Sequence, residues 1–273
     1  MSKFLAILLA IMVAGVFLAN TAFAIPSLPQ NWKFKFENFE MFTQNPPVGL
    51  GLADGVEDNW GIFRITTITD TLNLVDTYTT ASNYEITGIF YGLDMNDVIP
   101  TATGFDVNFV GGSLDIYVQD KTAAGYTKFN PALGPGGRGA PATFATVTDG
   151  TQLLHANFTP GIIPGDPVTT NASSVDALQN PITGDGEGWM DAIPGTGLWS
   201  DLIIGQPNNQ DAFLQFNFRD HPDPLLPDWG WDINSEDPVL GAAIPEPGTM
   251  ILLGVGLLGF AGIARRRRCH KDA

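Results

Sequence analysis

The chain has 273 residues, a formal net charge of −16 at pH 7 and a single cysteine. Between positions 25 and 243 it has seven lysine or arginine residues against 27 acidic ones, so this part alone carries a formal charge of −20. Such a surface repels nucleic acid and anionic membranes, and it attracts divalent cations. Because the only cysteine is Cys269, residues 25–243 contain no disulfide, no thiolate metal site and no cysteine nucleophile.

The N-terminus has the three parts of a secretory signal peptide. Lys3 supplies the positive charge, residues 4–18 are apolar, and Ala22 and Ala24 stand two apart, as in a small-x-small cleavage site. The pattern predicts a signal peptide over residues 1–24 and export through the Sec machinery. An uncleaved N-terminal membrane helix is the alternative.

The C-terminus, residues 244–273, combines a Pro-Glu-Pro element, an apolar run at 250–264 and a basic cluster. The element is Pro245, Glu246 and Pro247, and the cluster is Arg265, Arg266, Arg267 and Arg268. An α-helix over the apolar run would extend about 22 Å, whereas a hydrocarbon core is about 30 Å thick, so we expect a short transmembrane helix. The arginines place the C-terminus in the cytoplasm, and the prolines hold the backbone extended around the glutamate.

This order of parts resembles the PEP-CTERM sorting signal of Gram-negative bacteria. The resemblance covers residues 244–273. It implies sorting rather than a biochemical activity: transient anchoring in the inner membrane, processing near the Pro-Glu-Pro element by an exosortase-type enzyme, and delivery to the outer envelope, cell surface or extracellular matrix. It also implies an association with exopolysaccharide and with biofilm or floc. A plain C-terminal membrane anchor is the alternative.

Residues 25–243 consist of short segments in which apolar and polar residues alternate, the pattern of half-buried strands. Trp32, Phe34 and Phe36 share one face of the first segment. Further strands are predicted at 60–69, 83–92, 142–148, 152–158 and 212–218. Connections rich in Gly, Pro and Asn separate them. We therefore expect an all-β fold, a single jelly-roll-like β-sandwich over residues 25–243.

Two local predictions concern the connections. Residues 105–110 and 113–119 alternate on either side of Gly111 and Gly112, and two glycines in succession favour a hairpin turn because both tolerate positive φ. A short helical turn, capped by serine, is predicted at 173–179.

The sequence predicts no catalytic residue. His155 lies in a predicted strand and is expected to point to water, and His221 precedes a proline, so neither has the neighbours of a zinc site or a catalytic triad. Carboxylate-pair hydrolysis needs two acids about 5–10 Å apart. With 27 acidic residues, some pair always satisfies this distance. A polysaccharide hydrolase therefore remains an alternative, but the sequence assigns no particular pair of acids to it.

Calcium is the cofactor that the sequence suggests. Acid-rich turns with glycine or asparagine are expected at 54–59, 184–191 and 232–238, and oxygen ligands at alternate positions suit a hard cation. The candidate ligands are Asp185, Glu187, Asp191, Asp232, Asn234 and Glu236. The alternative is that Asp, Asn and Gly form ordinary turns.

Trp229 and Trp231 stand two residues apart and would share one face of a strand. A tryptophan pair at the rim of a sandwich stacks on sugar rings, whereas the same pair beneath a long loop completes the core. A secreted carbohydrate-binding module is therefore the second functional hypothesis. The first is a non-enzymatic surface or matrix protein, and the third is the hydrolase.

Overall fold

The computed structural model describes residues 28–29, 31–42, 53–180, 182–200, 203–204, 210–220 and 229–243. The all-β class predicted from the sequence is confirmed. The strands are β1 (Asn31–Phe42), β2 (Asn59–Asp70), β3 (Val75–Thr79), β4 (Tyr84–Pro100), β5 (Gly104–Asp120), β6 (Thr151–Thr159), β7 (Asn171–Asp176), β8 (Thr183–Ala192), β9 (Ile203–Ile204), β10 (Ala212–Asp220) and β11 (Ile233–Ala243). Two short 3-10 helices, η2 (Pro131–Leu133) and η3 (Pro135–Gly137), complete the regular structure of the described residues. Within the described ranges, no helix has the length and apolar character needed to cross a membrane.

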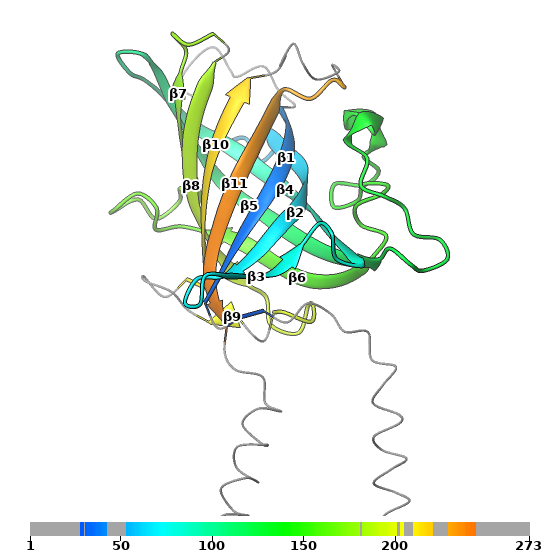
Figure 1. Cartoon of the computed structure of the whole chain (residues 1–273). Helices are drawn as coiled ribbons and strands as arrows, with labels where there is room; N and C mark the ends of the chain where they lie inside the picture. Colours follow the sequence, from blue (N-terminus) through cyan, green and yellow to red (C-terminus); the bar gives the residue numbers. More distant parts are fainter. Residues whose placement is uncertain are drawn as a thin grey trace, which may run out of the picture.

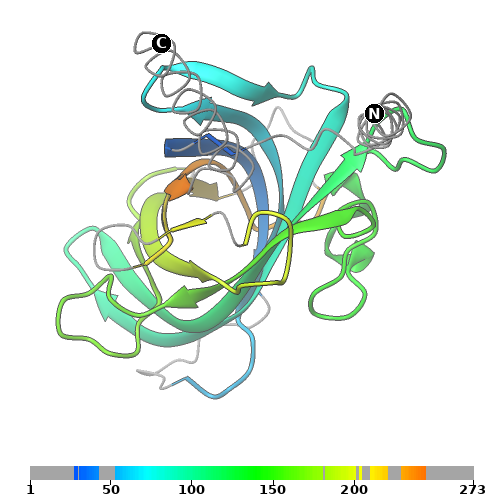
Figure 2. The same ribbon diagram turned by 90° about the horizontal axis from the view of Figure 1, so that it is seen from below.

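All strands belong to one antiparallel sheet that closes on itself as a cylinder (Figures 1 and 2). The order is β1-β11-β10-β8-β6-β5-β4-β2, and β2 pairs back with β1 to complete the ring. β7 takes the place of β6 between β5 and β8 over half of their length. Eight strands therefore surround the axis at each level, a number that leaves room for packed side chains or for one small ligand.

This closed sheet differs from the expected jelly-roll-like sandwich, which would divide the strands between two sheets. Here β1 pairs with β11 on one side and with β2 on the other, so the first strand joins the last. β4 and β5, each of 17 residues, pair with each other along most of their length. The difference arises because alternation in a sequence shows which side chains face the interior, but not which strands pair.

The predicted hairpin turn at Gly111 and Gly112 is wrong. β5 continues through both glycines, which have φ values of 69° and 91°, and Gly92 on the neighbouring β4 has a φ of 76°. The three glycines bend the two paired strands together, and at this bend β5 changes partner from β7 to β6. Positive φ suits a bend inside a strand as well as a turn, so the sequence did not distinguish them.

The other strand predictions are confirmed except one. The segments at 32–36, 60–69, 83–92, 152–158 and 212–218 belong to β1, β2, β4, β6 and β10. Residues 142–148 form turns with one isolated bridge instead. The predicted helical turn at 173–179 is also wrong, because residues 171–176 form β7 and pair with β5 and β8 on both sides.

The outer face of β1, β2 and β4 is covered by the long connection between β5 and β6 (Figure 1). The apolar residues of this outer cluster are Phe39, Trp60, Ile62, Ile89, Phe129, Phe144, Val147 and Trp231. Arg138 fixes the cover, since its guanidinium lies 4.2 Å from the ring centroid of Trp60 and forms an ion pair with Glu57. The apolar residues at 142–148 therefore cover the sheet rather than form part of it.

The interior of the cylinder is filled in one half. Trp32 and Phe34 stack with ring centroids 4.2 Å apart, and Trp199 lies 5.6 Å from Phe34. Trp199 belongs to the segment after β8, which crosses this end of the cylinder (Figure 2), and its backbone N–H donates to the carbonyl oxygen of Leu153 at 2.7 Å. Complete burial of each of these large side chains contributes roughly 2–3 kcal/mol, so this half is the packed core.

The bend in β5 generates the first prediction, which concerns Gly112→Ala. A Cβ at this position would lie 2.6 Å from Leu93 Cδ2, on a residue with a φ of +91°. Gly125 has a φ of +94° but no atom within 4 Å of an added Cβ, so Gly125→Ala is a matched control for backbone strain alone.

We expect Gly125→Ala to lower the unfolding free energy by about 1–2 kcal/mol and Gly112→Ala to lower it by about 1–3 kcal/mol more. Urea unfolding of protein purified after export measures both values. Equal losses would show that the bend has room for a side chain.

Candidate functional site

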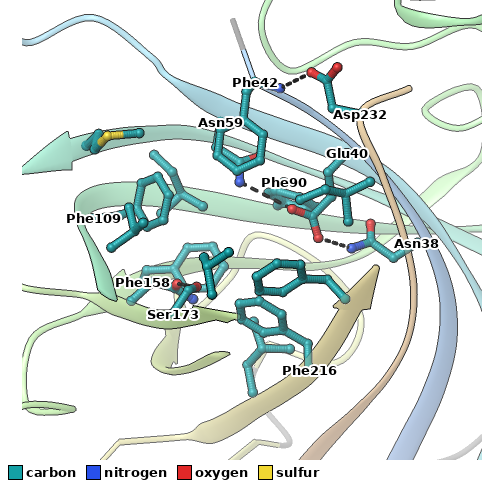
Figure 3. A pocket seen from close by; sticks show the side chains of 18 of the residues that line it. Asn38, Glu40, Phe42, Asn59, Phe90, Phe109, Phe158, Ser173, Phe216 and Asp232 are labelled. Atoms are coloured by element: carbon teal, nitrogen blue, oxygen red, sulfur yellow. Dashed lines mark hydrogen bonds between the residues drawn. The ribbon is translucent and has the colours of Figure 1, made fainter. Parts of the chain in front are cut away.

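The half of the cylinder opposite Trp199 encloses a cavity of about 420 Å³ (Figure 3). β1, the second half of β4, the first half of β5, β7 and β10 form most of its wall. Its lining is mainly aromatic and aliphatic, and includes Phe90, Phe109, Phe158 and Phe216. This volume and lining are typical of a small-molecule site, for which volumes of about 300–1,000 Å³ are usual.

Glycines on β8 make room beside this cavity. Gly184 and Gly186 have no side chain where Phe218 and Phe216 of the paired β10 approach, and a Cβ on either would lie 2.2 Å from the facing ring. Asp185 alternates with them and is exposed. Residues 184–191 are therefore part of a strand and not the expected turn, because the glycines provide space for aromatic rings.

One part of the cavity wall is polar. Glu40 of β1 is only 5% exposed and lies between Asn38 of the same strand and Asn59 at the start of β2 (Figure 3). Asn38 Nδ2 donates to Glu40 Oε1 at 2.5 Å, and Asn59 Nδ2 donates to Oε2 at 3.2 Å. The remaining oxygen of Asn59, Oδ1, is buried and accepts no hydrogen bond from the described residues.

Burial controls the charge of this glutamate. Loss of hydration raises the pKa of Glu40 from 4.5 to about 7, against the smaller lowering effect of the hydrogen bonds from Asn59 and Asn38. The described residues that line the cavity include no lysine, arginine or histidine. The carboxyl group therefore gains and loses its proton near neutral pH without a cationic side chain in the lining to stabilise its charged form.

Asp232 ties the segment before β11 to the end of β1. Its Oδ2 accepts a hydrogen bond from the backbone N–H of Phe42 at 2.9 Å, and its own N–H donates to the carbonyl oxygen of Glu40 at 3.0 Å (Figure 3). The side chain also lines the cavity, so the wall contains two acidic residues, Glu40 and Asp232.

The tail of the chain matches a known family. A family model described as the PEP-CTERM protein-sorting motif matches residues 243–268. The chain carries a PEP-CTERM sorting motif. This motif marks an exported protein for exosortase-dependent sorting. No curated protein and no solved structure matches the chain.

The PEP-CTERM match begins at Ala243, the last residue of β11, so the sorting motif follows the strand that closes the sheet. The other predictions for the two ends of the chain concern residues outside the described ranges. These are the cleavage-site residues Ala22 and Ala24, the Pro-Glu-Pro element, the helix predicted at 250–264 and the four arginines from Arg265 to Arg268.

Five of the proposed calcium ligands are distributed over two strands, and the sixth, Asp232, directly precedes β11. Asp185, Glu187 and Asp191 are on β8, while Asn234 and Glu236 are on β11, opposite Phe39 and Glu37 of β1. Residues 233–238 are strand as well, so the wrapping loop expected from the sequence is absent at both places. Among the described residues, no three His, Cys, Asp or Glu are placed to hold a metal ion. Calcium binding stays a prediction.

The tryptophan pair lies in the outer cluster. Trp231 is 4% exposed, its Nε1–H donates to the carbonyl oxygen of Pro131 at 2.8 Å, and its ring lies 5.3 Å from that of Trp60. Trp229 is half-buried with its ring 6.0 Å from Phe39. The structure thus places Trp231 beneath the long connection, as the core-completing alternative expected.

His155 does not simply point to water. Its Nδ1 lies 2.7 Å from Oδ1 of the buried Asp115, which also accepts hydrogen bonds from Gln152 and from the Tyr91 hydroxyl. Burial first, and then the nearby Asp115 carboxylate, raise the pKa of Tyr91 to about 12. This polar cluster connects β4, β5 and β6.

Sequence reasoning missed the polar part of the cavity wall. The alternation that places residues 32–36 in the core continues to Asn38 and Glu40 on the same inward face. Two polar residues on an otherwise aromatic face were the available signal. Asn59 gave no such signal, because it reaches Glu40 only through the pairing of β1 with β2.

The raised pKa of Glu40 makes the unfolding free energy depend on pH. An ordinary glutamate in the unfolded chain ionises near 4.5, whereas Glu40 in the folded protein ionises near 7. The folded state therefore keeps a proton that the unfolded state loses between these values. This proton stabilises the folded state fully below pH 4.5, and its contribution declines as the pH rises. Once the pH exceeds 7, the contribution is gone and the unfolding free energy is lower by about 3 kcal/mol.

We predict that Glu40→Gln abolishes this dependence. Between about pH 4.5 and pH 8, the unfolding free energy of the variant should rise by about 3 kcal/mol relative to that of the unmodified protein. Urea unfolding across this range measures the difference. Asp76→Asn, at an exposed acid on β3, is the control and should follow the unmodified protein. Parallel curves for all three proteins would contradict the assignment.

Proposed function

We propose that this chain is an exported, non-enzymatic binding protein of the cell envelope or extracellular matrix, and that its closed sheet holds a small, largely apolar molecule. The observation that carries the proposal is the cavity of about 420 Å³ with its mainly aromatic and aliphatic lining. Burial of apolar surface contributes about 25 cal/mol per Å², so a ligand that fills such a space gains affinity from most of its surface.

The chemistry of the wall favours an apolar molecule over a sugar. A sugar would bring many hydroxyl groups into the cavity, and each buried hydroxyl without a partner costs roughly 1–3 kcal/mol. The polar side chains that face the cavity are few and mostly gathered at its β1 and β7 sides. Carbohydrate binding and polysaccharide hydrolysis are therefore less well supported as functions of this cavity.

The sorting motif supports the location in this proposal. A PEP-CTERM motif at residues 243–268 marks the chain for exosortase-dependent sorting, and the predicted signal peptide supplies the export step. We propose that the tail anchors the chain transiently in the inner membrane before processing. The acidic exported part, with a formal charge of −20, then associates with exopolysaccharide through cations that its surface attracts.

We predict that the mature protein lacks the C-terminal tail. The intact mass of protein extracted from the surface of exporting cells should exclude residues 250–273, because processing acts near Pro-Glu-Pro. In a variant with alanine at Pro245 and Pro247, we expect the full tail to be retained. Recovery of the complete tail from unmodified protein in cells with an active exosortase would refute the prediction.

A second prediction tests whether ligands occupy the cavity. Ser173 on β7 lines the cavity, whereas its neighbour Ser174 is exposed. Ser173→Phe should fill part of the space and weaken binding of a neutral, polarity-sensitive dye such as Nile red by at least about tenfold, equivalent to about 1.4 kcal/mol. Ser174→Phe adds the same side chain outside and should bind the dye normally.

Fluorescence titration of the three proteins measures these affinities, and thermal melting checks that both variants are folded. Identical dye affinities would place the dye outside the cavity. If none of the proteins binds the dye or any other apolar compound, the binding proposal fails.

A further inference from the structure

We propose that the cavity takes an apolar amine, with the cationic head group held at Glu40 and Asn59 and the apolar body in the aromatic part of the cavity. The inference rests on the proposed function, because it names the ligand class of the same cavity. Three features of the wall support it: a carboxyl group, an amide oxygen without a partner and the absence of a basic side chain among the described lining residues.

The polar groups around Glu40 favour a ligand that brings a hydrogen-bond donor. Three asparagines line the cavity. Asn38 Nδ2 and Asn59 Nδ2 donate to Glu40, whereas Asn171 lies on β7, where its Oδ1 accepts a hydrogen bond from Ser173. Asn59 is 5% exposed, yet its Oδ1 accepts no hydrogen bond from the described residues. A buried acceptor without a donor is costly. An ammonium group has several N–H donors and can bond to this oxygen and to the carboxylate together.

The charges of the wall select the sign of the head group. Glu40 and Asp232 are the acidic residues of the lining, and no described lining residue is basic. A ligand carboxylate would add a further negative charge to this low-dielectric site, which costs energy. A neutral alcohol would meet Asn59 Oδ1 but would leave an ionised Glu40 without a counter-charge. An ammonium group satisfies both needs.

The aromatic rings close to the polar residues add to this preference. Phe42 and Phe90 line the same cavity as Glu40 (Figure 3). The face of an aromatic ring attracts a cation, and the attraction strengthens when water is excluded. The rings therefore bind the apolar body and also favour a positive head group over a neutral one of the same size.

The inference implies a defined pH dependence. The titratable residues in the described lining are Glu40 and Asp232, and the amides of Asn38 and Asn59 do not titrate. Only the ionised form of Glu40 pairs with an ammonium group, and the pKa of this glutamate lies near 7 in the ligand-free protein. Amine affinity should therefore be greatest above pH 7 and weaken as the pH falls below that value.

The test compares decylamine, decanol and decanoic acid, each below the concentration at which it aggregates. These compounds share an alkyl chain and differ in the head group. The protein is purified after export without detergent. The affinity for each compound is measured by displacement of Nile red and confirmed by calorimetry. At about pH 8 we expect decylamine to bind at least about tenfold tighter than decanol, because only the amine carries a charge that pairs with the ionised Glu40. Decanoic acid should bind most weakly, because its negative charge adds to that of the wall.

Two variants assign the preference to the site. Glu40→Gln should reduce decylamine affinity by at least about tenfold and leave decanol affinity nearly unchanged. Asp76→Asn removes the same charge from an exposed position on β3 and should leave the affinities for all three compounds unchanged. The comparison of compounds and pH values on the unmodified protein does not depend on either variant.

The outcomes separate this inference from the proposed function. If decanol or decanoic acid binds as tightly as decylamine at about pH 8, or if the preference for the amine persists in Glu40→Gln, the amine inference is overturned while the cavity remains a binding site. If no compound binds and Nile red does not bind, both proposals fail.

Discussion

The pairing of β1 with both β2 and β11 is the constraint on which the rest of the structure depends. It joins the first strand to the last, so that the inward-facing side chains of the sheet point into one enclosed interior. It also assembles the polar wall. Asn59 of β2 lies opposite Phe42 of β1, and Ile233 of β11, the residue after Asp232, lies opposite Glu40 of β1. Without this closure, a carboxyl group on β1 would face water rather than an enclosed space.

Side-chain size divides the closed sheet into a core and a cavity. Large rings such as Trp32, Phe34 and Trp199 fill one half, and the segment that contains Trp199 crosses that end. In the other half, glycines on β8 face the phenylalanines of β10, and the cavity remains. A carboxyl group in such a place costs stability, because burial opposes its ionisation. Local costs of this kind are expected at functional sites.

The last described residue before the tail, Ala243, and the cavity are at opposite ends of the cylinder. The PEP-CTERM match begins at Ala243, and the neighbouring Ala242 pairs with Asn31 beside the filled half. The cavity is lined instead by residues near the other ends of β1 and β11, including Phe42 and Ile233. Processing of the tail would leave the cavity wall intact.

The sequence by itself determined the sorting motif, the acidic character and the all-β class, because these depend on composition and on local order along the chain. The alternation in β1 determined that Asn38 and Glu40 face the interior. Only the tertiary structure decided that Gly111 and Gly112 bend a strand, that residues 184–191 are strand and that the sheet closes, since each outcome depends on which strands pair. The site itself followed from that closure: Asn59 meets Glu40 through contacts between residues 19 positions apart, which no local pattern specifies.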